Sequence, residues 1–164
     1  MIRSKLLYGL ESAQLDLGQL RKLNTFHLKG LRKILRMKTT FVERANTNEE
    51  VYKRANEALS QEGSKRKVSP FQEAYKSSKV KRMHRILKST PSDPVRSTNL
   101  DQRGQAWTYA GLRPGRPKTK WAEDAMRLYW QHNREALPVH LRNAVFNPRN
   151  ILHAEALKQV ADNL

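Results

Sequence analysis

Lysine and arginine at helical spacing are the side chains of this sequence with the clearest chemistry, because cations on one helix face can pair with a row of phosphates. The chain has 164 residues and a net charge of +17. The excess is uneven: residues 65–88 carry +8, whereas residues 121–164 carry zero. Crowded like charges repel one another and destabilise a compact fold unless a polyanion neutralises them. This charge pattern indicates a nucleic-acid partner.

Two predicted helices and one loop hold the candidate contacts. Asp16 can cap the first helix, which should run to about Met37 with its leucines on one face and its cations on the opposite face. Ser69 and Pro70 give a second start signal, and that helix should reach about Lys88. We expect nucleic-acid contacts from Lys22, Lys29, Arg32, Lys33 and Arg36 on the first helix, from Lys81, Arg82, Arg85 and Lys88 on the second, and from Arg113, Arg116 and Lys118 in the loop.

The loop contains the most distinctive local motif, Arg-Pro-Gly-Arg-Pro-Lys at residues 113–118. A Gly-Arg-Pro core between basic residues resembles the AT-hook, whose extended arginines enter the narrow minor groove of A·T tracts. The usual hook has arginine directly before the glycine, and this chain has Pro114 there. The sequence therefore favours a basic, stiffened tether over specific minor-groove reading.

Residue patterns of catalysis and metal binding are missing from the sequence. The five histidines form no pair at the i, i+4 spacing of a helical metal site, and there is no cysteine. There is also no glycine-rich phosphate loop and no nucleophile elbow. We therefore expect no catalytic residue, no metal and no cofactor, and hence no enzyme. No apolar run approaches the roughly 18 residues of a membrane span, so a membrane partner is not expected.

Helix signals dominate the chain, and no stretch alternates between apolar and polar residues as a half-buried strand would. The predicted class is all-α, a small helical bundle. Residues 1–88 should form a basic helical domain. Residues 89–120 hold four of the seven prolines and predict a linker, and residues 121–164 predict a C-terminal helical segment.

The sequence predicts two further helices. Thr47 and Glu50 have the spacing of a capping box and should start a helix there. Asn147 and Pro148 should begin the last helix. On that helix we expect an inward face made of Ile151, Leu152, Leu157, Val160 and Leu164.

Four segments, taken in order, resemble the reverse transcriptases of non-LTR (LINE-type) retrotransposons. Residues 4–9 (Ser-Lys-Leu-Leu-Tyr-Gly) are similar to the segment just after the catalytic palm, and Leu23 to Leu35 match the Leu-x-x-Phe…Leu-Arg-x-Ile-Leu pattern of the thumb. Residues 84–88 (His-Arg-Ile-Leu-Lys) resemble the segment after the thumb. Residues 115–117 (Gly-Arg-Pro), four residues before Trp121, resemble a stretch near the family's end.

The resemblance implies a thumb and C-terminal extension without the catalytic palm. The family's palm carries an Asp-Asp motif that holds the metal ions of nucleotide transfer, and no Asp-Asp pair occurs here. The zinc knuckle of some members is also missing. A thumb closes over the template–primer duplex and contacts its backbone without reading sequence. The expected function is therefore nonspecific binding of RNA, DNA or an RNA–DNA hybrid.

The sequence leaves two other classes of protein open. A structural RNA-binding protein of a ribosomal or other ribonucleoprotein particle would share the charge and the helices. A helical protein-interaction module would dock a partner through residues 121–164 or through a short apolar helix predicted over residues 2–13. A nucleic-acid partner favours the nucleus over the cytoplasm, with an organelle left open.

Overall fold

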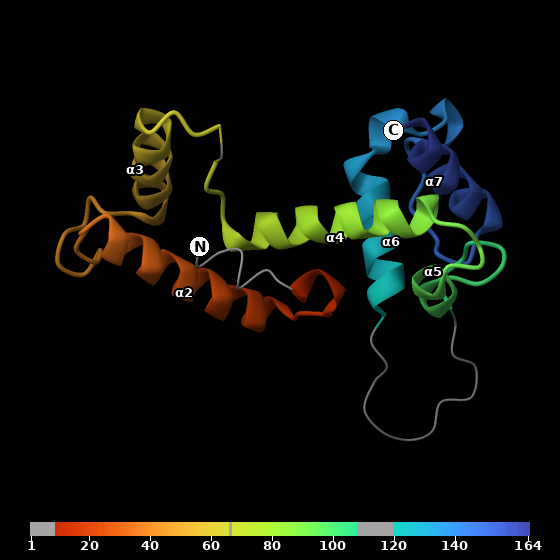
Figure 1. Cartoon of the computed structure of the whole chain (residues 1–164), viewed down its shortest axis with the longest axis horizontal. Coiled ribbons are helices and arrows are strands. Elements are labelled where there is room, and N and C mark those ends of the chain that lie inside the picture. The colour runs from red at the N-terminus through yellow and green to blue at the C-terminus, as the bar shows by residue number, and fades with distance from the viewer. Residues whose placement is uncertain (1–8, 66, 108–119) are drawn as a thin grey trace, which may run out of the picture. The chain divides into compact units, whose positions relative to one another are not determined.

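The computed structural model describes residues 9–65, 67–107 and 120–164. This part of the chain contains helices and no strand, which confirms the predicted all-α class (Figure 1). The α-helices are α2 (Leu17–Ile34), α3 (Asn48–Gln61), α4 (Phe71–Lys88), α5 (Pro94–Asn99), α6 (Trp121–His132) and α7 (Ile151–Asn163), and the short 3₁₀ helices are η1 (Leu10–Ser12), η2 (Arg134–Ala136) and η3 (Val139–Leu141). Arg113, Arg116 and Lys118 lie outside the described residues.

The chain divides into two compact units. Unit 1 includes Leu15–Tyr75, and unit 2 includes Gly9–Gln14 together with Lys76–Leu164. The boundary therefore falls inside α4. This division differs from the predicted boundaries at residues 88 and 120, because the second half of α4 shares one apolar core with α6 and α7.

Local start signals place the first two helices of unit 1 where the sequence predicts them. Asp16 accepts a hydrogen bond from the Gln19 amide at 2.7 Å, and the Gln19 side chain accepts one from the Asp16 amide at 3.0 Å. Thr47 accepts from the Glu50 amide at 3.3 Å and caps α3. Both caps pair amides that the first turn of a helix leaves without partners.

The interior of unit 1 is small and joins three helices. Helices α2 and α3 contact each other, and the side chains of Leu20, Leu28, Val51 and Phe71 are buried. Asn24 links the three helices, because its side-chain oxygen accepts from the Tyr52 hydroxyl of α3 at 2.9 Å and from the first amide of α4 at 3.0 Å.

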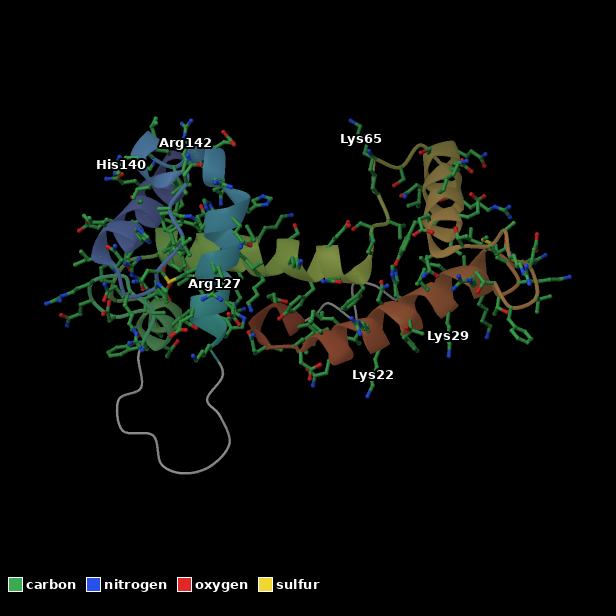
Figure 2. The ribbon with its side chains drawn as sticks, turned by 180° about the vertical axis from the view of Figure 1, so that it is seen from behind. Lys22, Lys29, Lys65, Arg127, His140 and Arg142 are labelled. Carbon is green, nitrogen blue, oxygen red and sulfur yellow. The ribbon has the colours of Figure 1, made fainter. Side chains whose placement is uncertain are left out.

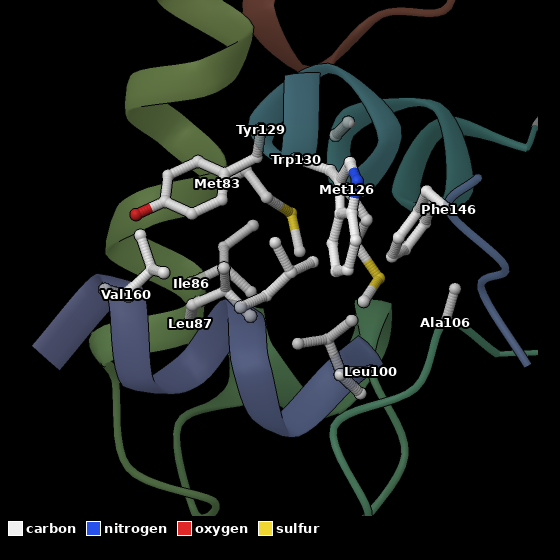
Figure 3. Close-up of a cluster of buried hydrophobic side chains, with 14 of the residues drawn as sticks. Met83, Ile86, Leu87, Leu100, Ala106, Met126, Tyr129, Trp130, Phe146 and Val160 are labelled. Carbon is white, nitrogen blue, oxygen red and sulfur yellow. The ribbon is translucent and has the colours of Figure 1, made fainter. Parts of the chain in front are cut away.

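The core of unit 2 is larger, and Figure 3 shows how α4, α6 and α7 surround it. Its largest fully buried side chains include Tyr129 and Met126 from α6, Met83 and Leu87 from α4, and Leu157 from α7. Phe71, Tyr75, Met83, Ile86 and Leu87 form the apolar side of α4, and all five are buried.

The prediction of a linker over residues 89–120 is wrong for residues 89–107. This stretch contains α5, and it contributes Leu100 and Ala106 to the core of unit 2. Arg96 is buried and donates from Nη1 to the carbonyls of Leu87 at 2.9 Å and Ser89 at 3.1 Å, so it caps the C-terminal end of α4. The prolines of the stretch mark turns and a helix start rather than an unfolded tether.

The last helix begins at Ile151 and is capped by Asn150, so the predicted start at Asn147 and Pro148 is wrong, and the predicted inward face is partly wrong. Leu157 and Val160 are buried as expected, but Ile151, Leu152 and Leu164 are exposed. His153 and three alanines fill the buried face of α7 together with Leu157 and Val160. Small side chains there allow the helix to lie close to α6, so bulk alone did not indicate which side faces inward.

Candidate nucleic-acid interface

Three lysines of α2 form an exposed stripe, here called the lysine stripe and made of Lys22, Lys29 and Lys33. At 3.6 residues per turn their side chains leave the helix within an arc of about 40°. Figure 2 shows Lys22 and Lys29 pointing away from the ribbon of α2 toward the same side. The stripe can therefore meet one linear row of phosphates.

Nothing on α2 neutralises this stripe. The helix contains five Lys and Arg residues and no Asp or Glu. Across the described residues, ion pairs within 4.0 Å involve other cations, and none involves a stripe lysine. Lys29 and Lys33 also line a hollow of about 460 Å³ near the N-terminus of α3, together with Arg32. The positive charge of this face is thus available to an external anion.

Arg32 lies off the stripe and has a structural role. Its Nη2 donates to the Asn46 carbonyl at 3.2 Å and to the Asn48 side chain at 2.9 Å, while its Nε is buried without a hydrogen-bond partner. These bonds tie the end of α2 to the start of α3. Because no carboxylate in the described part of the chain pairs with it, its charge still adds to the potential of the adjacent hollow.

Arg36 ends α2 in a backbone conformation that usually belongs to glycine. Its φ is 52°, its amide bonds to the Lys33 carbonyl at 3.3 Å, and the Met37 amide bonds to the Arg32 carbonyl at 2.9 Å. These two bonds form a Schellman motif. The helix therefore stops at Ile34, three residues before the predicted end, and the exposed Arg36 side chain leaves from the turn instead of from the helix face.

Helix α4 carries a second exposed row of cations in unit 2. Lys81, Arg85 and Lys88 leave the helix within an arc of about 60° and are exposed. Arg82 points elsewhere: it is half-buried, lies 3.8 Å from a Glu11 carboxylate oxygen and stands over the Trp121 ring at 5.8 Å. Three of the four predicted contacts on α4 are thus brought together, and the fourth is engaged inside unit 2.

A hollow of about 320 Å³ adjoins the second row of cations, lined by Lys81 and Arg85 together with His84 and Tyr129. The His84 Nδ1 and the Tyr129 hydroxyl share a hydrogen bond of 3.0 Å. Burial raises the pKa of the Tyr129 hydroxyl, so this group stays neutral in its hydrogen bond with His84. Lys81 and Arg85 supply positive charge beside a space that an anionic group can enter.

Lys79 is a cation that the sequence analysis missed. Its side chain is buried, its Nζ donates to Gln14 at 2.8 Å, and it lies 5.7 Å from the centre of the Trp121 ring. Burial lowers the pKa of the ammonium group, and the negative charge of Asp124 opposes part of that shift. Lys79 lies four residues after Tyr75 and four before Met83, on the apolar face of α4. This spacing was the sequence signal that its side chain would be buried.

Phe26 is a second residue that the predicted interface did not include. Its ring is 57% exposed although it lies on α2 between Lys22 and Lys29. The sequence pattern assigned it to the thumb-like motif only. Its position four residues after one stripe lysine and three before the next was a sufficient signal that it shares their face.

Comparisons with known proteins found no match, whether to family models, to curated proteins or to solved structures. Among the described residues, no helix is long and apolar enough to span a membrane. In the same residues no three His, Asp or Glu side chains gather as a metal site would require.

Proposed function

We propose that this chain is a non-catalytic nucleic-acid-binding protein that holds the sugar–phosphate backbone without reading base sequence. The observation that carries this proposal is the lysine stripe, a row of exposed cations on a helix that has no carboxylate. The exposed row Lys81, Arg85 and Lys88 gives a second surface of the same kind in unit 2. The resemblance to a retrotransposon reverse transcriptase thumb supports the same function, because a thumb binds backbone and leaves catalysis to the palm.

The proposal is tested by the salt dependence of binding. If six to ten cations contact phosphates, the affinity for a labelled duplex should fall by about 10³- to 10⁵-fold between 50 and 200 mM salt. The plot of log K against log salt has a negative slope, and changing Lys22, Lys29 and Lys33 together to glutamate should make this slope shallower by at least about 2–3. Fluorescence polarisation gives both quantities.

A matched control variant separates a local surface from net charge. Arg127, Arg149 and Lys158 are exposed cations of the neutral segment 121–164, and their change to glutamate removes the same total charge. We expect this control to keep most of the binding. Equal losses in both variants would mean that only the overall charge matters, and salt-independent binding would overturn the proposal.

A ribonucleoprotein component would use the same surfaces, and recovery of the chain in a particle would distinguish it. A protein-interaction module is supported by a different feature, a groove of about 520 Å³ in unit 1 whose apolar lining includes Leu31, Ile34 and Leu59. An apolar complex should persist at high salt and be lost in Leu59→Glu, whereas phosphate binding should weaken with salt and survive that change.

A further inference from the structure

We propose that the lysine stripe binds single-stranded nucleic acid in preference to duplex, with one unpaired base stacked on Phe26. This inference rests on the proposed function and names the form of nucleic acid that its first surface takes. The structural observation is an exposed aromatic ring set among cations that have no partner in the described part of unit 1.

Phe26 shares the face of the stripe. It leaves α2 about 40° from Lys22 and about 20° from Lys33, and it lies between Lys22 and Lys29 along the helix axis. At 1.5 Å per residue, about 6 Å of helix separates Phe26 from Lys22 and about 4.5 Å separates it from Lys29. Long flexible lysine side chains on both sides can reach the phosphates that flank one nucleotide held at the ring.

Within the described part of unit 1, the Phe26 ring is not part of the packed interior. It belongs neither to the buried side chains of that unit nor to the residues lining its apolar groove. The buried aromatic contacts of α2 are made by His27, the next residue, whose ring lies 6.1 Å from Tyr52 and 6.3 Å from Phe71. Phe26 leaves the helix about 100° from His27, and its ring is exposed beside the lysines.

A phenyl ring cannot contact phosphate favourably, and it finds no free base face on a duplex, where bases are stacked on one another. A single strand exposes base faces, and proteins that bind such strands combine a cationic track with aromatic side chains on which bases stack. Charge complementarity and the exposed ring therefore point to the same occupant. Because every base has a π-face, this contact adds affinity without adding sequence preference.

The test compares oligo(dT) of about 12 nucleotides with a blunt duplex of the same length, using the full chain. Phe26→Ala should weaken oligo(dT) binding by about 5- to 100-fold, the range expected for loss of one base–aromatic stack. The salt slope should stay unchanged, because no cation is removed, and duplex binding should change by less than about twofold. Phe26→Leu should lose nearly as much as Phe26→Ala, since leucine keeps the bulk but not the ring.

Two further variants complete the test. Phe26→Trp should retain tight binding and should place a tryptophan in unit 1 whose fluorescence falls when oligo(dT) binds. Phe41 is 98% exposed but lies outside the stripe, so Phe41→Ala is the matched control and should bind oligo(dT) within about twofold of the original chain. Circular dichroism checks that each variant keeps its helices.

The possible failures are distinguishable. If oligo(dT) and duplex both bind in a salt-dependent way and Phe26→Ala changes neither, or weakens both equally, the stacking inference is wrong and the proposed function stands. An equal loss in Phe41→Ala would also overturn the assignment to the stripe. If neither probe binds, both the inference and the proposed function are overturned.

Discussion

Replacing Arg36 by glycine should stabilise unit 1 while weakening nucleic-acid binding. Arg36 has a φ of 52°, where an L-residue with a Cβ costs about 1–2 kcal/mol and glycine costs almost nothing. Part of this gain is lost, because glycine gives the unfolded chain more conformational freedom and so lowers the free energy of unfolding by about 0.4–1 kcal/mol. The net gain should be about 0.5–1 kcal/mol. The backbone bonds at 2.9 and 3.3 Å that close the turn remain available to glycine.

Arg36→Ala provides the control, because it removes the same charge but keeps the Cβ. Thermal unfolding followed by circular dichroism should place the glycine variant about 2–5 °C above the alanine variant. Both variants should lose a similar amount of affinity, with a salt slope about 0.7–0.9 smaller if Arg36 contacts one phosphate. Equal stability of the two variants would refute the reasoning from backbone conformation, and unchanged slopes would remove Arg36 from the interface.

Two predictions concern unit 2. Burial lowers the pKa of His153, and its Nδ1 accepts a hydrogen bond from the Asn147 amide at 3.0 Å. As the pH drops below about 6.5, the unfolded chain therefore takes up the proton first, and the stability of the fold should decrease. Between pH 7.5 and 5 the melting temperature should fall more for the original chain than for His153→Gln, and parallel curves would contradict this. Arg96→Met should lower the free energy of unfolding by about 2–4 kcal/mol in urea titrations, because two carbonyls at the end of α4 lose a charged donor, whereas exposed Arg103→Met should change it by less than about 0.5 kcal/mol.

Helix starts and the charged faces were predictable because they depend on short-range chemistry. The capping box of Asp16 and Gln19 involves residues three apart, and any chain with that spacing can form it. The lysine stripe follows from the helical repeat and the lack of carboxylates on α2, which need no tertiary contact. The sequence thus placed three of the five predicted contacts of unit 1, the stripe lysines, on one exposed face.

The sequence was less informative about which cations remain available. Lys79 and Arg96 are as basic as their neighbours, yet one lies against Trp121 and the other caps α4. Arg32 has the sequence context of a backbone contact but braces Asn46 and Asn48. These outcomes depend on groups distant along the chain, so a local pattern could not distinguish them.

The sequence by itself determined the helical class, the starts of α2 and α3 and the clustering of positive charge, because hydrogen bonding and periodicity within a few residues are enough for each. The tertiary structure decided the rest. It placed Leu100 and Ala106 in the core of unit 2, turned Ile151 and Leu152 outward, and left Phe26 exposed among lysines. Burial is a property of what packs against a residue, and that depends on which distant segments meet.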